Sequence, residues 1–123
     1  MKGTLKSRRA FTHIYDHGER AIGAHVVVFA LTRNDTRIPE LEGAMSAVGI
    51  VASRKVGHAP DRSRAKRVMR AALRSIRTRS ELQGHLVLVA RRALIADAVG
   101  SVDLEPELER LLDRAGALRR EKP

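Results

Sequence analysis

Cysteine is absent from this chain of 123 residues, so neither disulfide bonds nor cysteine-based zinc sites can stabilise it. No apolar run approaches the roughly 18 residues of a membrane-spanning helix. The basic residues at positions 1–9 are not followed by an apolar stretch, which argues against a secretory signal peptide. These absences fit a cytoplasmic protein without membrane contact. The length predicts a single domain over residues 1–123 with a modest core.

Aromatic residues are also scarce, because Phe11, Tyr15 and Phe29 are the only three in the chain. The core must therefore consist mainly of Val, Leu, Ile and Ala. Phe11 and Tyr15 are four residues apart, a spacing that places them on the same side of a helix.

Acidic residues are nearly missing from positions 54–79, which contain ten Lys or Arg residues and one acid, Asp61. This stretch contributes nine of the ten formal positive charges of the chain. Screening over about 8 Å at physiological salt relieves only part of the mutual repulsion. The pattern therefore predicts a polyanionic partner, such as the phosphates of RNA or DNA. The alternative, a solvated basic face that binds nothing, is disfavoured.

Three segments have the apolar periodicity of helices: residues 7–17, about 60–78 and about 103–115. Ser7 is the expected N-cap of the first, and Gly18 and Gly116 follow the first and last, where glycine commonly ends a helix. We expect the end of the chain, from about residue 117 to 123, to be frayed.

Three other segments read as β-strands: residues 24–31, 45–53 and 85–91. The first is a nearly continuous run of β-branched and apolar residues, which is typical of a strand covered on both faces. Gly49 weakens the second strand and suggests a bulge or a close backbone approach. The polar residues 32–43 read as a connecting loop.

The central helix has two contrasting sides at about 100° per residue. Asp61 is its expected capping carboxylate. The apolar side contains Ala65, Val68, Met69, Ala72, Leu73 and Ile76, and the opposite side contains Lys66, Arg67, Arg70, Arg74 and Arg77. No glutamate at four-residue spacing offsets these charges, although such pairs are easily made on a helix. This favours nucleic-acid contact along the charged side.

Carboxylates are absent from all three predicted strands and collect at residues 35–42 and 97–113. Two-metal hydrolysis of a phosphodiester needs clustered carboxylates on rigid elements. The sequence therefore predicts no catalytic residue in the protein itself. His13 and His17 have a spacing that can bind metal, but no third ligand accompanies them, so no metal site is expected.

The basic region closely resembles the signature of the bacterial ribonuclease P protein subunit. The matching residues are Arg54-Lys55-Val56-Gly57, Ala59, Arg62-Ser63-Arg64-Ala65-Lys66-Arg67 and Arg70. Supporting similarity covers Leu5-Lys6 through Phe11, Tyr15, His17 and Gly18, then Val27-Val28-Phe29, Val48-Gly49, residues 87–91 and residues 108–116. Ser63 stands where the family usually has asparagine, so a single hydroxyl replaces an amide there.

The resemblance implies an α+β fold, a mixed-sheet sandwich with α-β-β-β-α-β-α order similar to the second domain of ribosomal protein S5. It also implies a left-handed β-α-β crossover, whereas general topology favours the right-handed form.

The function implied by the resemblance is that of ribonuclease P, a holoenzyme whose RNA subunit removes the 5′ leader of precursor tRNA with magnesium held mainly by RNA. The implied contacts to the catalytic RNA are Arg54, Lys55, Arg62, Ser63, Arg64, Lys66, Arg67, Arg70 and Arg74. The implied leader-binding cleft contains Phe11, Tyr15, Val27 and Phe29. From the residues alone, ordinary core positions are the favoured interpretation of Phe11 and Phe29, and only the resemblance favours the cleft.

Two other classes of function remain open at this stage. A ribosomal or general RNA-binding protein would share the basic helix and the sheet, but would not require the glycine turn together with this order of basic residues. A DNA-binding module is disfavoured, because no helix-turn-helix pair and no zinc spacing is present.

Overall fold

The computed structural model describes residues 8–31 and 47–119 and shows an α+β fold. Its elements, in chain order, are α1 (Arg8–His17), β1 (Glu19–Ile22), β2 (Val26–Leu31), β3 (Val48–Val51), α2 (Ala59–Arg77), β4 (Glu81–Leu82), β5 (His85–Ala90), α3 (Arg92–Ala96), α4 (Ser101–Arg114) and β6 (Leu118–Arg119). The helices and strands predicted from the residue pattern are all present, with shorter bounds for the strands. The observed order departs from the expected α-β-β-β-α-β-α by the additional short elements β4, α3 and β6.

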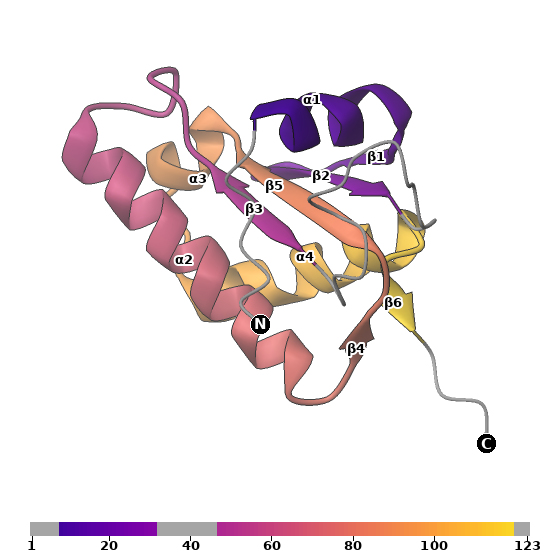
Figure 1. Cartoon of the computed structure of the whole chain (residues 1–123). Coiled ribbons are helices and arrows are strands. Elements are labelled where there is room, and N and C mark those ends of the chain that lie inside the picture. The colour runs from indigo at the N-terminus through magenta and orange to yellow at the C-terminus, as the bar shows by residue number, and fades with distance from the viewer. Residues whose placement is uncertain (1–7, 32–46, 120–123) are drawn as a thin grey trace.

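The main sheet has four strands in the order β1-β2-β5-β3 (Figure 1). The β1–β2 and β2–β5 pairs are antiparallel, whereas β3 and β5 are parallel neighbours, so the sheet is mixed as expected. Helix α2 lies between β3 and β5 in the chain and makes the crossover that a parallel pair requires. A separate two-stranded sheet joins β4 to β6.

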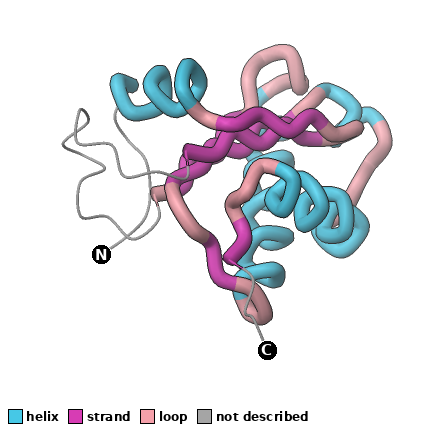
Figure 2. Tube along the Cα trace, turned by 90° about the vertical axis from the view of Figure 1, so that its right-hand side faces the viewer, coloured by secondary structure: helices cyan, strands magenta, loops and turns pink. Residues whose placement is uncertain are grey.

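Helices cover the two faces of the main sheet unequally. Figure 2 shows the sheet nearly edge-on, with α1 above it and the longer helices below. The lower face packs on α2 and α4 and forms the larger core, to which Val26, Val28 and Leu88 contribute fully buried side chains. The upper face packs on Ala10 and Ile14 of α1 and is only partly covered. The incomplete cover leaves apolar side chains of the sheet accessible beside α1.

Helix α2 buries the side that the sequence predicts. Ala65, Val68, Met69, Ala72, Leu73 and Ile76 are all buried against the sheet and α4. Its N-terminus differs from the prediction, because the N-cap is His58 and no side chain caps the first turn. The prediction of Asp61 as the capping residue is wrong: Asp61 lies inside the first turn, where its charge complements the helix dipole.

Strand β1 was not among the elements derived from the residue pattern. It is only four residues long and has exposed Glu19 and Arg20, so it shows little of the apolar alternation that marks a strand. The strand forms because it pairs with β2, although its own sequence has little strand pattern. Of the two alternatives expected at Gly49, the bulge is not found, because the pairing of β3 with β5 continues from Val48 to Val51 without interruption. The close backbone approach stays a prediction.

The end of the chain is more ordered than predicted. Ala117 and Leu118 are buried, and β6 pairs with β4, so the expectation of fraying from residue 117 is wrong for residues 117–119. Gly116 has a φ of 76° directly after α4 and its following turn, in agreement with its predicted role. The predicted Ser7 cap, the similarity at Leu5-Lys6 and the loop at residues 32–43 lie outside the described residues.

A buried histidine gives the fold a testable pH dependence. His85 is 2% exposed, and its Nδ1 accepts a hydrogen bond of 3.0 Å from the Ala47 N–H. Burial lowers the pKa of His85 below its usual value. Because the folded pKa is lower than the unfolded one, the stability due to the neutral ring is present above about pH 6.5 and is lost as the pH falls through the folded pKa.

We expect the free energy of unfolding of the wild type to fall below pH 6.5 more steeply than that of His85→Asn. Asparagine keeps an acceptor but does not titrate. The difference in slope should reach up to about 1.4 kcal/mol per pH unit for one proton. Urea unfolding from pH 5 to 8 measures it, with the exposed His58→Gln as control. Parallel curves for wild type and His85→Asn would contradict the assignment.

Candidate RNA interface

A turn between β3 and α2 presents the first two basic residues of the candidate interface. Val56 is buried in the core, and its N–H donates to the Ser53 carbonyl at 3.0 Å. Gly57 has a φ of 152°, and a Cβ there would clash with Oδ2 of Asp61. Glycine is therefore required for the chain to enter α2 in this way. The anchored turn leaves Arg54 and Lys55 exposed to solvent.

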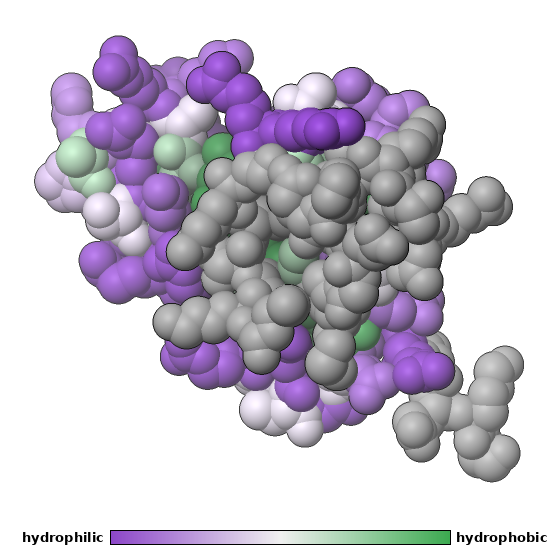
Figure 3. All heavy atoms as spheres, viewed as in Figure 1, coloured by the Kyte–Doolittle hydropathy of each residue, from purple (hydrophilic) through white to green (hydrophobic). Residues whose placement is uncertain are grey.

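The remaining basic residues follow one side of α2. We call this surface the cationic strip, and it comprises Arg54, Lys55, Arg62, Lys66, Arg67, Arg70, Arg74 and Arg77. Hydrophilic side chains gather over α2 in the space-filling view (Figure 3). At 1.5 Å per residue the helical part extends about 22 Å. Ser63 is exposed within the strip, whereas Arg64 falls about 120° from Arg70 on the other flank of the helix.

The positive charge of the strip is not neutralised by the part of the chain that the structure describes. Among residues 8–31 and 47–119, no ion pair joins any strip residue to an acid. The backbone of α2 holds these side chains on a rigid element, so their repulsion is built into the fold. Such a surface attracts a polyanion strongly.

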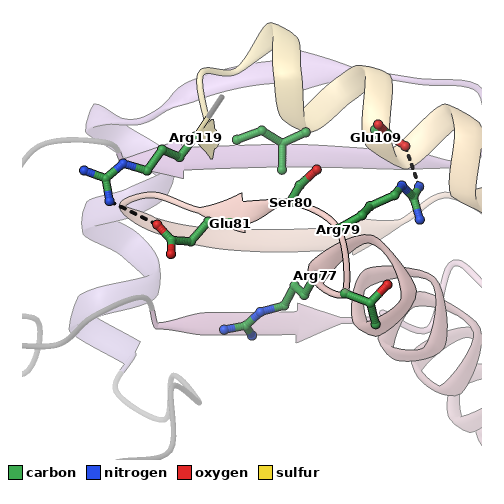
Figure 4. Close-up of a pocket in the computed structure, with 8 residues that line it drawn as sticks. Arg77, Arg79, Ser80, Glu81, Glu109 and Arg119 are labelled. Carbon is green, nitrogen blue, oxygen red and sulfur yellow. Dashed lines mark hydrogen bonds and ion pairs between the residues drawn. The ribbon is translucent and has the colours of Figure 1, made fainter. Parts of the chain in front are cut away.

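Arg79 differs from the strip although it belongs to the same basic stretch. Its guanidinium contacts Glu105 at 2.6 Å and Glu109 at 2.5 Å, both on α4. Figure 4 shows the pair with Glu109. The Ser75 hydroxyl and the Arg79 guanidinium hold the pKa of Glu105 below its usual value. Arg79 therefore ties the end of α2 to α4, and the unpaired strip ends at Arg77.

Each end of α2 borders a hollow. At the N-terminal end, a cavity of about 620 Å³ is lined by Arg54, Lys55, Val56, Gly57, His58, Ala59, Arg62 and Arg92. The sequence analysis missed Arg92, the first residue of α3, because only tertiary packing brings it to this place. At the other end, a cavity of about 500 Å³ has Arg79 and Arg119 among its lining residues, but each is paired with a glutamate (Figure 4). The first cavity is thus the more cationic one.

The three aromatic residues lie together between α1 and the sheet. The ring centroids of Tyr15 and Phe29 are 4.8 Å apart in an edge-to-face arrangement, and those of Phe11 and Tyr15 are 6.4 Å apart. Tyr15 is 38% exposed, and Phe11 and Phe29 are half-buried. Burial raises the pKa of the Tyr15 phenol, so its hydroxyl remains a donor at neutral pH. This aromatic cluster is therefore neither fully core nor fully exposed.

An apolar row lies next to the aromatic cluster on the same face of the sheet. The strand register places Ile22, Val27, Val89 and Val51 directly opposite one another across β1, β2, β5 and β3. Ile22 is 51% exposed, and the three valines are half-buried. Of these four, the sequence analysis singled out only Val27. The alternation in β2 and β5 could have indicated Val89, but Ile22 lies in strand β1, which the residue pattern did not mark.

Titratable ligands for a metal are not gathered in the described part of the chain. His13 and His17 have ring centroids 4.4 Å apart, but no group of three His, Cys, Asp or Glu that could hold a metal ion is found there. No helix among the described residues is long and apolar enough to cross a membrane.

Comparison with known proteins identifies the family of this chain. Residues 1–116 match the family model described as Ribonuclease P. The chain belongs to the ribonuclease P protein family. The ribonuclease P protein component of Symbiobacterium thermophilum is 35% identical over 117 residues, which cover 95% of this chain and 94% of that protein. The corresponding protein of Nitratiruptor sp. is also 35% identical, with coverage of 93% and 94%. The resemblance drawn from the basic motif is thereby confirmed.

Solved structures of the family have the same fold. The ribonuclease P protein of Thermotoga maritima is 27% identical, with a TM-score of 0.70 and coverage of 90% of this chain and 96% of that one. The protein of Staphylococcus aureus superposes with a TM-score of 0.75 at 22% identity, with coverage of 97% and 100%. Membership of an RNA-processing family makes the cationic strip the leading candidate for the RNA contact.

Proposed function

We propose that this protein binds the catalytic RNA subunit of ribonuclease P through the cationic strip. The main observation behind the proposal is that eight cations on one surface have no acidic partner among the described residues. Each cation that neutralises an RNA phosphate releases a counterion, which makes the affinity strongly dependent on salt. The flanking Arg64 and the short hydroxyl of Ser63 add smaller contacts in this proposal.

We further propose that the aromatic cluster and Val27 bind the single-stranded 5′ leader of precursor tRNA. Half-exposed rings offer faces and edges on which bases stack without strict sequence choice. The row beside them adds apolar area on the same face of the sheet. Val51 at the end of this row is followed two residues later by Ser53 and then Arg54, so the proposed leader surface adjoins the start of the strip.

In this proposal the RNA subunit performs the hydrolysis, and magnesium is held mainly by RNA. Asp61 is the single acid of the basic stretch, and its carboxylate lies against Gly57. The described residues therefore offer the strip no carboxylate pair for a metal ion. The protein contributes affinity and orientation, and it would act with its RNA in the cytoplasm. We also propose the left-handed β3-α2-β5 crossover and the similarity to the second domain of ribosomal protein S5.

Reconstitution with the cognate catalytic RNA tests this function. We expect the protein alone to leave precursor tRNA uncut. Added to the RNA subunit at a magnesium concentration where that RNA alone is slow, it should restore release of the 5′ leader. The rate of leader release, measured with RNA alone, protein alone and both together, separates these contributions.

Two results would contradict the proposal in different ways. Site-specific, metal-dependent cutting by rigorously RNA-free protein would place the chemistry in the protein. Tight RNA binding without any gain in cleavage would instead indicate a general RNA-binding protein.

A further inference from the structure

A histidine bridges two carboxylates at the turn between β1 and β2, on the far side of the sheet from the aromatic cluster. His25 Nδ1 lies 2.7 Å from Glu107 Oε1 of α4, and Nε2 lies 2.9 Å from Asp97 Oδ2 in the turn after α3. The second carboxylate oxygen of Glu107 accepts the N–H groups of His25 at 2.8 Å and of Val26 at 3.3 Å. The turn between β1 and β2 is thus hydrogen-bonded both to α4 and to the turn after α3.

The backbone of the turn is shaped around this contact. The Gly23 N–H donates to the Val26 carbonyl at 2.9 Å, and a Cβ on Gly23 would lie 2.5 Å from Glu107 Oε2. Arg91 Nη1 donates to the Gly23 carbonyl at 2.6 Å. Glu107, Asp97 and Arg91 are the charged groups that contact the turn among the described residues. No part of the proposed RNA-binding surfaces accounts for this arrangement.

The bridge can be complete only when the imidazole is protonated. A neutral ring has one N–H, whereas the imidazolium has two and can donate to both carboxylates. The Glu107 side chain is 11% exposed and the Asp97 side chain 60% exposed. When the proton leaves, the remaining N–H stays with Glu107, because a buried carboxylate oxygen that loses its donor is costly, whereas the exposed Asp97 can bind water instead. Deprotonation therefore breaks the hydrogen bond between Nε2 and Asp97.

The hydrogen bond to Glu107 raises the pKa of His25 above its usual value; partial burial opposes this rise and the bond to Asp97 adds to it. The folded pKa is thus higher than the unfolded value of about 6.5. The complete bridge is present below about pH 6.5 and is lost as the pH rises through the folded pKa.

The turn also determines where the apolar row ends. Ile22 directly precedes Gly23, pairs with Val27 and is the most exposed member of the row. The Asp97 end of the bridge lies in a strained turn, since Ala98 has a φ of 52°, which residues with a Cβ rarely adopt. Breaking the hydrogen bond to Asp97 removes the side-chain contact that joins this turn to the one that follows Ile22, and leaves the contacts of Arg91 with Gly23 and His25.

We propose that His25 is a proton-dependent positioning residue that holds the Ile22–Val27 end of the leader surface in its binding geometry. This inference rests on the proposed function, because it assigns a role within the leader surface. It predicts that the part of the affinity due to the leader, and not the affinity for tRNA as such, depends on the protonation of His25.

The test uses the reconstituted holoenzyme and two ligands. One is precursor tRNA with a non-hydrolysable linkage at the cleavage site, and the other is mature tRNA. The ratio of their affinities, measured from pH 5.5 to 8.5, is the leader gain. In the wild type we expect the leader gain to fall about two- to fivefold as the pH rises, as expected for loss of one partly exposed ion pair.

Three variants make the result specific. His25→Gln should give a leader gain that no longer changes with pH. Asp97 is exposed, and in Asp97→Asn the asparagine amide can donate a hydrogen bond to the unprotonated Nε2 of His25. The leader gain of this variant should therefore stay high at alkaline pH. His17→Gln, an exposed histidine at the end of α1 and outside the cluster, should keep the wild-type profile. Melting temperatures of all three variants report whether each is folded.

The outcomes separate this inference from the function on which it rests. A leader gain with the same pH profile in wild type, His25→Gln and Asp97→Asn would overturn the role of His25 and leave leader binding intact. A wild type without any leader gain between pH 5.5 and 8.5 would overturn the proposed leader surface and this inference with it.

Discussion

Replacing Phe29 or Tyr15 by alanine is expected to weaken binding of precursor tRNA about 5- to 150-fold, since one base stack contributes about 1–3 kcal/mol. Mature tRNA has no leader and should bind almost as it does to the wild type. The expectation follows from the half-exposed rings, whose centroids lie 4.8 Å apart beside a face of the sheet that α1 covers only in part. Equilibrium affinities of the holoenzyme for the two ligands give the measurement.

Val87→Ala is the matched control. Val87 pairs directly with Phe29 and points to the same face of the sheet, but it is fully buried under α1. Its truncation should lower the free energy of unfolding by leaving a cavity. Any loss of affinity should then be the same with and without a leader.

The alternative is that the aromatic residues belong only to the core. In that case Phe29→Ala should cost about 3–5 kcal/mol of stability. Binding should then follow the unfolded fraction regardless of the leader. Equal losses for precursor and mature tRNA, together with a large fall in melting temperature, would rule out the leader-binding role.

The second large effect concerns the cationic strip. Arg67→Ala and Arg70→Ala should each weaken binding to the catalytic RNA, and the slope of log affinity against log salt should become shallower by roughly one unit for each phosphate no longer neutralised. Both residues are exposed on the strip and have no acidic partner among the described residues. Affinities measured over a range of monovalent salt give the slope.

Arg79→Ala removes the same charge from the same basic stretch and is the control for net charge. Arg79 is paired with Glu105 and Glu109, so its loss should affect the contact between α2 and α4 more than the salt slope. An unchanged slope in both Arg67→Ala and Arg70→Ala would mean that the strip is a solvated face. A slope reduced equally by Arg79→Ala would mean that only overall charge matters.

The sequence by itself determined the parts of the protein that depend on local periodicity. The six buried residues of α2 and its charged side follow from a repeat of 3.6 residues, which burial on one side imposes on any amphipathic helix. The strands β2 and β5 follow from continuous β-branched runs. The motif of residues 54–70 was sufficient to identify the family, because the glycine turn and the order of basic residues occur together.

Only the tertiary structure decided which residues meet across long distances in the chain. Strand β1 has little pattern of its own and is ordered by its pairing with β2, so the place of Ile22 in the apolar row could not be predicted. Arg92 reaches the first turn of α2 from α3. Two glutamates of α4 pair with Arg79, so its charge does not contribute to the cationic strip.

The bridge at His25 is the clearest example of a contact that the sequence could not predict. Its partners Asp97 and Glu107 are 72 and 82 residues away, so no local pattern marks them as a unit. Hydrophobic periodicity records which side of an element is buried, because burial acts on each residue separately. Pairing between charged groups depends on where whole elements lie, and that is settled only when the sheet and its helices have packed.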